Sequence, residues 1–318
     1  MQTRSQAMYF IGVDVSKESL DVYIRPEDIL LRFSNTDKGI QSFVGLLKKY
    51  KECLVVFEAT GGYEKPLKMS LIKNGVEHRV LNPTRVREFA KACGKLAKTD
   101  SVDAQILSAF AEKMEPFSGH QPCEEEILLK DLVHRRQQLI EEIVREKNRL
   151  DKCFQEVIKK NILSHLEQLQ QYMKEMDKLI TELIRKVKTL NHKAKIISSV
   201  PGVGATTASV LLADLPELGN LKNKQIASLA GLAPMNKDSG KTQGYRTIMG
   251  GRLSVRCSLY MATLVAIRHN TLIKIFYKRL REKGKPGKVA LVACMRKLVT
   301  ILNQMVMHDN LWQDNKKI

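Results

Sequence analysis

Four acidic residues in the first third of the chain are placed where their carboxylates could act together. Asp14 and Glu58 each lie at the end of a short apolar run that is typical of a buried β-strand. Asp100 and Asp103 stand three residues apart at the start of a predicted helix, so they share one helical face. Mg²⁺ prefers such anionic oxygen ligands, and two such ions can clamp the attacking and leaving oxygens of a phosphodiester. The sequence therefore predicts an acidic two-metal site.

Each of these residues also has an ordinary structural interpretation. Asp100 can cap the helix that it begins, because a carboxylate is stabilised at a helix N-terminus, and Asp14 can end its strand in a turn. All four stand at the ends of elements that suit one fold, and this joint placement favours the metal site. Gly12 before Asp14, and Gly61 with Gly62 after Glu58, are weaker indications that backbone approaches closely there.

A candidate nucleophile, Ser239, lies far from these carboxylates in the sequence. It occupies a Gly- and Lys-rich stretch, LAGLAPMNKDSGKTQGYRTIMGGR, at 229–252, and no nearby His could serve as its base. An ordinary hydrolase triad is therefore disfavoured. Gly240 follows the serine directly and leaves its hydroxyl accessible to a bulky phosphate. Thr242, Ser254 and Ser258 are the competing hydroxyls.

The elements that must position the carboxylates read as an α/β layer. We expect strands at 9–15, 19–25, 30–34, 54–57 and 78–81, and helices at 36–50, at about 63–74, and from residues 84 and 99 onward. This βββαβαβα order suits a ribonuclease-H-like fold.

The composition changes near Pro122, where we place a domain boundary. From 124 to 190 the chain is highly charged with few Gly or Pro, which predicts long helices. One apolar seam keeps 3,4 spacing without a break, and a looser seam precedes it. These seams consist of Leu166, Leu169, Met173, Met176, Ile180, Leu183, Val187 and Leu190, and of Leu139, Ile143, Leu150 and Val157. We expect an antiparallel helical hairpin, and the seam can be satisfied within the chain or by another subunit.

From residue 196 onward the sequence predicts a compact all-helical domain. The segment 196–214, IISSVPGVGATTASVLLAD, resembles a helix-hairpin-helix, in which Gly202 and Gly204 would let helix N-terminal amides hold a phosphate. Alternatively, this turn only connects two helices and binds nothing.

The charge of the chain favours a polyanionic partner. Lys and Arg outnumber Asp and Glu by 53 to 34, a formal net charge of +19. The excess is concentrated in 241–300, where 14 Lys or Arg stand against Glu282 alone. A solubilising surface is the alternative explanation. The candidate nucleic-acid contacts in and around this segment are Lys241, Arg246, Arg252, Lys283, Lys285 and Lys288.

The remaining composition excludes several classes of protein. Six cysteines are scattered without a CxxC pair and without His at zinc-ligand spacing, which disfavours a zinc site and indicates a reducing compartment. The apolar runs look too short to cross a bilayer, and the N-terminus lacks a signal sequence. We therefore expect a soluble cytosolic protein.

Six separated motifs carry a family resemblance: GVDVSK, FEATGGY, KTDSVDA, VPGVG, GLAP followed by SG, and KPGKVALVACMRKL. In this order they resemble a DEDD transposase of the insertion-sequence family one hundred and ten, related to the Piv-type DNA invertases. The resemblance spans nearly the whole chain and is weakest in the central helical region. The family commonly has Gly-Asn before a Leu-Arg after its serine loop, whereas this chain has Gly250-Gly251-Arg252-Leu253.

The resemblance implies three regions: a RuvC-like acidic domain at 1–122, a helical coiled-coil region at 123–193, and a transposase domain at 194–318. It implies that Ser239 attacks a DNA phosphate and forms a phosphoserine link, with Mg²⁺ held by Asp14, Glu58, Asp100 and Asp103. It further implies a dimer or tetramer, a Holliday-junction-like intermediate, and a structured bridge RNA that selects the target.

Two other functions fit part of the sequence. A RuvC-like nuclease that hydrolyses DNA junctions with water would need the four carboxylates and would leave Ser239 as a loop residue, so a covalent protein–DNA adduct would separate it from a transposase. A non-catalytic nucleic-acid-binding protein would need only the basic segment, and binding without cleavage in Mg²⁺ would favour it.

Overall fold

The computed structural model describes residues 9–50, 52–94, 100–114, 122–235 and 246–313 of the 318-residue chain. The chain forms two compact units, Met1–Gly119 and His120–Ile318.

The first unit is built on a five-stranded mixed sheet in the order β3-β2-β1-β4-β5. Its strands are β1 (Tyr9–Val15), β2 (Ser19–Arg25), β3 (Ile29–Ser34), β4 (Cys53–Glu58) and β5 (His78–Leu81). The first three form an antiparallel meander, and β4 pairs parallel with both β1 and β5. The carboxyl ends of β1 and β4 therefore lie at the same edge of the sheet.

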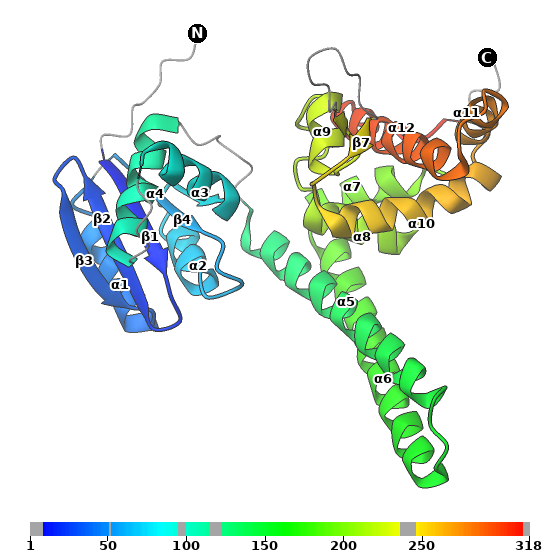
Figure 1. Ribbon diagram of the computed structural model, residues 1–318, viewed down its shortest axis with the longest axis horizontal. Coiled ribbons are helices and arrows are strands. Elements are labelled where there is room, and N and C mark those ends of the chain that lie inside the picture. The colour runs from blue at the N-terminus through cyan, green and yellow to red at the C-terminus, as the bar shows by residue number, and fades with distance from the viewer. Residues whose placement is uncertain (1–8, 51, 95–99, 115–121, 236–245, 314–318) are drawn as a thin grey trace. The chain divides into compact units, whose positions relative to one another are not determined.

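Helices cover both faces of this sheet (Figure 1). They are α1 (Asp37–Leu47), α2 (Lys65–Lys73), α3 (Pro83–Ala92) and α4 (Asp100–Met114). Ile11, Val13 and Phe57 point into one apolar core with α1 and α2, whereas Val56 and Leu107 belong to a second core with α3 and α4. The α/β class and the order of elements expected from the sequence are confirmed.

The second unit begins with two long helices, α5 (Glu124–Leu150) and α6 (Glu156–Lys186), which run side by side as a hairpin (Figure 1). Leu139 and Ile143 of α5 pack against Ile162, Leu166 and Leu169 of α6 in one buried cluster. Along this part of the hairpin, the apolar seam of α5 thus covers the regular apolar seam of α6 within a single chain.

The regular seam is interrupted, contrary to the expectation of an unbroken helix. Val187 adopts an extended conformation (φ −90°, ψ 111°) and is both the C-cap of α6 and the N-cap of α7 (Lys188–Ser198). Leu190 is buried in the core of the C-terminal helices, and so is Ile180, which precedes the break in the same seam. The apolar pattern therefore passes from the hairpin cluster into that core within α6, before the change of direction at Val187.

The rest of this unit is helical apart from one short ladder. After α7 come α8 (Ala205–Asp214), α9 (Asn223–Leu229), β6 (Pro234–Met235), β7 (Thr247–Ile248), α10 (Leu253–His269), α11 (Thr271–Glu282) and α12 (Gly287–Met307). The antiparallel pair β6–β7 departs from the all-helical expectation. Each of these strands has only two residues, which is too few to show the alternation that identifies a strand in a sequence.

Helix α12 corrects the expectation that no apolar segment could span a bilayer. By length and composition it is long and apolar enough, although half of it is buried inside the unit. Leu298, Val299 and Leu302 are completely buried in the core of the C-terminal helices. This burial explains why α12 is apolar, because it is a core helix of this unit.

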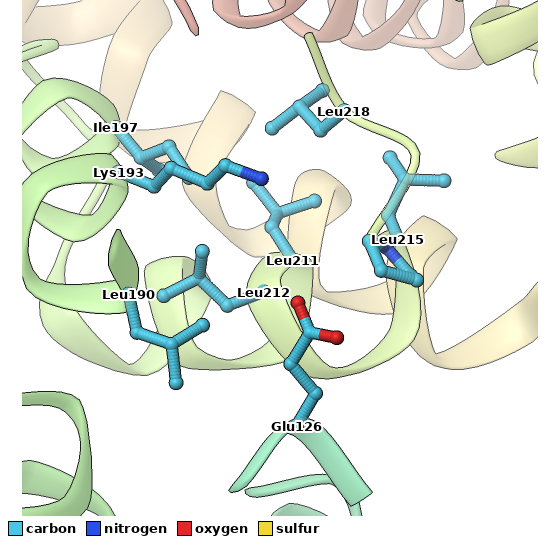
Figure 2. Close-up of a pocket in the computed structure, with 9 residues that line it drawn as sticks. Glu126, Leu190, Lys193, Ile197, Leu211, Leu212, Leu215 and Leu218 are labelled. Carbon is cyan, nitrogen blue, oxygen red and sulfur yellow. The ribbon is translucent and has the colours of Figure 1, made fainter. Parts of the chain in front are cut away.

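The start of α5 packs against α7 and α8 around a small recess (Figure 2). Leu190 and Ile197 of α7 and the leucines of α8 and its following turn line it, together with the polar side chains of Glu126 and Lys193. Its volume of about 10 Å³ leaves room for one water at most. It is a packing contact between helices and offers no room for a ligand.

Candidate active site

The structure places two of the predicted carboxylates side by side at the carboxyl ends of two neighbouring strands. Val13 of β1 stands opposite Phe57 of β4 in parallel register, and Asp14 and Glu58 are the next residues on these strands. Val13 and Phe57 point into the core with α1 and α2. Because side chains alternate along a strand, Asp14 and Glu58 both belong to the opposite face, which α4 covers.

Gly12 brings α4 onto this face. A Cβ atom at Gly12 would lie 2.1 Å from the carbonyl oxygen of Ala104 and 2.5 Å from the amide nitrogen of Ser108, so the helix touches the strand backbone. Toward the other end of β1, Arg25 donates to Ser108 Oγ (3.2 Å) and to Glu112 (3.3 Å). The helix therefore runs back along β1, and its first turn lies toward the Asp14 end.

Asp103 lies in that first turn, one residue before the contact with Gly12. It is half-buried, as are Asp14 and Glu58. The side chain of Asp100, at the first position of α4, lies outside the described residues. The described side chains include no group of three or more His, Cys, Asp or Glu that could hold a metal ion. The described part of the site is thus an adjacent pair on two strands with a third carboxylate on the helix above.

The loop after Glu58 is held in shape by a residue that the sequence analysis missed. Glu64 Oε2 accepts hydrogen bonds from the N–H of Thr60 (3.1 Å), the Thr60 hydroxyl (2.9 Å) and the N–H of Gly62 (2.8 Å). Burial raises the pKa of Glu64, but these hydrogen bonds outweigh it and lower the pKa below its ordinary value. Gly61 and Gly62 both have positive φ, which explains their glycine identity.

In the second unit, Ser239 and Lys241 lie outside the described residues, but the two ends of their segment are well defined. Pro234 pairs with Ile248 and Met235 with Thr247 in the β6–β7 ladder. The chain therefore leaves and re-enters the described fold at neighbouring positions.

A contact between glycines fixes the downstream end of this segment. A Cβ atom at Gly251 (φ +71°) would lie 2.1 Å from the amide nitrogen of Gly231, and one at Gly231 would lie 2.3 Å from the carbonyl oxygen of Gly250. Asparagine tolerates a positive φ, but no side chain fits at this contact. Packing therefore requires glycine at position 251, where the family commonly has Asn, whereas a Cβ atom at Gly250 would meet open space.

Arg252, a predicted nucleic-acid contact, is engaged within the fold. Its guanidinium donates two hydrogen bonds to the carboxylate of Glu217 (2.5 and 2.6 Å) and one to the carbonyl oxygen of Asp214 (2.9 Å). The carboxylate of Asp214 is buried, lies 2.9 Å from His134 Nε2 and accepts from Ser254 Oγ (2.6 Å). This network ties α5, α8 and α10 together.

The two glycines of the helix-hairpin-helix-like turn have different environments. Gly202 has φ +99°, and a Cβ atom there would lie 2.7 Å from the backbone of Ala266 in α10, so packing explains it. Gly204 is the N-cap of α8, and no heavy atom would lie within 4 Å of its Cβ. The N-terminal amides of α8 are accordingly open on this side.

The other predicted basic contacts are exposed. Arg246 precedes β7, and Lys283, Lys285 and Lys288 surround the turn between α11 and α12. An exposed basic turn of this kind suits contacts to a phosphate backbone.

Comparison with known protein families identifies both halves of this arrangement. A family model described as "Transposase", of DEDD type, matches residues 11–159, which include the predicted carboxylates. A second model, "Transposase IS116/IS110/IS902 family", matches residues 194–278, which include the serine segment. The chain belongs to the IS110 family of transposases. It is thus a DNA transposase or recombinase, and the predicted enzyme class is confirmed.

Relatives of this transposase include proteins that rearrange genes. It is 27% identical over 302 residues to the pilin gene-inverting protein of Moraxella bovis, covering 92% of this chain and 94% of that protein. It is 29% identical over 113 residues to an uncharacterized protein of insertion element IS110 in Streptomyces coelicolor, covering 35% and 28% of the two chains. It is 31% identical over 136 residues to a protein of insertion element IS900 in Mycobacterium paratuberculosis, covering 41% and 32%.

Proposed function

We propose that this transposase cuts and rejoins DNA strands with Ser239 as its nucleophile, assisted by an acidic Mg²⁺ site at Asp14, Glu58, Asp100 and Asp103. The observation that carries the proposal is the adjacent placement of Asp14 and Glu58 on one face of the sheet, with α4 pressed onto Gly12 beside them. Such carboxylates at the same edge of a sheet suit phosphodiester chemistry.

The proposed fold of the first unit is ribonuclease-H-like, of the RuvC type. Its support is the antiparallel meander β1–β3 followed by the parallel strands β4 and β5, in the spatial order 3-2-1-4-5. We assign the acidic domain to residues 1–122, the helical hairpin region to 123–193, and the serine-bearing transposase domain to 194–318.

The donor set fits a hard cation, because every proposed ligand is a carboxylate. Mg²⁺, as one or two ions, would supply electrostatic stabilisation of the charge that develops on the phosphate oxygens. Gly12 and the loop held by Glu64 fix the strand ends from which Asp14 and Glu58 project, and α4 orients Asp103. These contacts reduce the reorganisation that the site needs when it binds DNA.

In the proposed reaction the oxygen of Ser239 attacks a DNA phosphorus atom. The serine hydroxyl loses its proton to solvent, a new Oγ–P bond forms, and one P–O bond to the departing strand breaks. That strand leaves as an alcohol after it takes up a proton. The hydroxyl of a second strand then attacks the phosphoserine, which restores Ser239 and conserves the phosphodiester. No external energy source is required.

Nucleic-acid binding is proposed for the exposed basic residues Arg246, Lys283, Lys285 and Lys288, together with Lys241 and the open N-terminus of α8 near Gly204. Since Arg252 is engaged with Glu217, we assign it a role inside the fold. A structured bridge RNA, a dimer or tetramer, and action in the cytosol complete the proposal, as the family resemblance implies. By analogy with the pilin gene-inverting relatives, the product is a specific DNA rearrangement.

Ser239→Ala tests the nucleophile. Wild-type protein, incubated with its bridge RNA, DNA carrying the ends of its element and Mg²⁺, is expected to give a denaturant-resistant protein–DNA adduct that maps to Ser239. The variant should lose the adduct and cleavage yet still bind DNA, because the change removes one hydroxyl and no charge. Thr242→Ala, in the same segment, is the matched control and should keep the adduct.

The same assay tests the acidic site and the competing nuclease. Asp14→Ala, Glu58→Ala, Asp100→Ala and Asp103→Ala should each abolish cleavage while the protein stays folded. Full activity of the Asp14 or Glu58 variant would refute the acidic site. Cleavage by wild-type protein without any covalent species would instead establish a RuvC-like nuclease that uses water.

A further inference from the structure

One row of charged side chains crosses the sheet next to the acidic site. Asp21 of β2 stands opposite Asp14 of β1, and Arg32 of β3 stands opposite Asp21. On the other side of Asp14, Glu58 occupies the next position of β4. Directly opposite residues have side chains on the same face of a sheet. Arg32, Asp21, Asp14 and Glu58 therefore lie on the α4 face in this order, one positive charge followed by three negative ones.

Asp21 and Ser19 hold the arginine in this row. Arg32 Nη2 donates to Ser19 Oγ at 3.0 Å, and Arg32 Nε lies 3.6 Å from Asp21 Oδ1. The Ser19 hydroxyl also donates to Asp21 Oδ2 at 3.3 Å. Asp21 and Ser19 are 7% exposed, whereas 67% of the Arg32 side chain is exposed. A buried carboxylate and hydroxyl thus anchor one edge of the guanidinium and leave the rest in solvent.

The anchoring leaves donors available on Arg32. A guanidinium has five N–H donors in a fixed fork. Within the described part of the chain, Nε and Nη2 face Asp21 and Ser19, and Nη1 has no acceptor. This is the geometry that suits an oxyanion, because Arg binds phosphate through parallel N–H bonds. A phosphate there would sit at the β3 edge of the same face as Asp14, two strands away.

We propose that Arg32 binds a phosphate of the DNA strand that lies at the acidic site, and that Asp21 is the residue that positions it. The proposal rests on the function proposed above, since it requires a DNA strand to cross the α4 face of the sheet at Asp14. The backbone of such a strand carries several phosphates past this site. Arg32 attracts one of them at a position where Asp14 and Glu58 alone would repel it.

A simpler role for Arg32 would be to neutralise Asp21 and nothing more. Two carboxylates directly opposite each other on neighbouring strands repel, and a counter-ion relieves that repulsion. The two roles differ in the double variant Arg32→Gln with Asp21→Asn. Removing both charges leaves no unpaired carboxylate at position 21, so a pure counter-ion role predicts normal DNA binding and cleavage. A phosphate-binding role predicts that the defect of Arg32→Gln persists.

The test uses full-length protein, its bridge RNA and DNA carrying the element ends, with both affinity and strand cleavage measured. Arg32→Gln is expected to weaken DNA binding about ten-fold, as for the loss of a charged hydrogen bond. It should also lower the slope of log affinity against log salt by about 0.9, the value for one lost phosphate contact. Arg32→Lys should recover part of the affinity, and Asp21→Asn should weaken binding less than Arg32→Gln does.

Lys49→Gln is the matched control, because it removes one exposed positive charge just beyond α1, at the opposite end of the sheet. It should leave the salt slope unchanged. The proposal is overturned if Arg32→Gln binds and cleaves like wild type, or if the double variant recovers fully. Those results leave the Ser239 adduct of the wild-type protein in place, whereas loss of the proposed function itself would appear as no adduct in wild type.

Discussion

Gly12→Ala should damage both the stability and the activity of this transposase, although glycine to alanine is the smallest possible enlargement. The added methyl carbon would lie 2.1 Å from the carbonyl oxygen of Ala104 and 2.5 Å from the amide nitrogen of Ser108. Both obstacles are backbone atoms of α4, which no side-chain rotation can remove. Real Cβ contacts essentially never fall below 3.0 Å, so α4 must move away from β1 by about 1 Å.

The magnitude follows from that displacement. Overpacking of this kind costs about 1–3 kcal/mol of unfolding free energy. The same shift carries Asp103, one residue before Ala104, away from Asp14. A misplacement of about 1 Å in a catalytic arrangement can lower the rate about 100-fold. The activity loss should therefore exceed what the loss of folded protein explains at moderate temperature.

Two measurements separate these effects: urea unfolding of the purified variant, and single-turnover strand cleavage at a temperature where it is fully folded. Gly45→Ala is the matched control. Gly45 lies within α1, and no heavy atom would lie within 4 Å of an added Cβ. Alanine there should raise stability by about 0.5–1 kcal/mol, because it favours the helix, and should not change cleavage. A Gly12→Ala protein with wild-type stability and rate would show that α4 does not fix the acidic site.

Three further predictions concern the second unit. The pKa of Asp214 is lowered because hydrogen bonds from His134 and Ser254 outweigh the effect of burial. The ionised carboxylate therefore stabilises the folded state above the unfolded pKa of about 3.9. This contribution to the unfolding free energy is lost as pH falls through the lower folded pKa. Asp214→Asn should cost about 1–3 kcal/mol at neutral pH, and urea unfolding at several pH values should show the difference from wild type shrinking below about pH 4; a constant difference would contradict the assignment. Arg252→Gln and Glu217→Gln should each destabilise this unit, and a double-mutant cycle should give a coupling of about 1 kcal/mol or more; additive effects would mean that the pair contributes little. Neutralising Lys283, Lys285 and Lys288 together should lower the salt slope of DNA binding by up to about 0.9 per lysine, and an unchanged slope would place the binding surface elsewhere.

The strands and helices of the first unit were predictable because each carries its own periodicity. The positions of Asp14 and Glu58 at strand ends followed from local sequence alone. Their side-by-side register did not, since pairing depends on contacts between residues more than forty positions apart. The same limitation hid Arg32 and Asp21, which look like ordinary surface charges until β2 and β3 are aligned.

In the second unit, local signals did not reveal two features of the fold. The 3,4 spacing continues through Val187, but α6 ends there, and the spacing gives no sign that Ile180 and Leu190 pack into the core of the C-terminal helices. Arg252 was assigned to nucleic acid from charge alone, and only the fold brings Glu217, 35 residues earlier in the chain, within hydrogen-bonding distance of it. Net charge indicates the kind of partner a protein binds, but it does not identify which cations make the contact.

The hairpin of α5 and α6 is the part of this chain whose length can change without disturbing the rest of the fold. Its buried cluster of Leu139, Ile143, Ile162, Leu166 and Leu169 is closed between the two helices of one chain. Deleting or duplicating seven residues in each helix keeps the same apolar positions of α5 and α6 facing each other. It changes the length of the hairpin by about 10 Å. Such an event leaves the sheet of the first unit and the helical core of the second intact. Homologues of different total length are therefore expected to differ here in whole heptads, and chimaeras joined within the hairpin should fold when the heptad phase is kept.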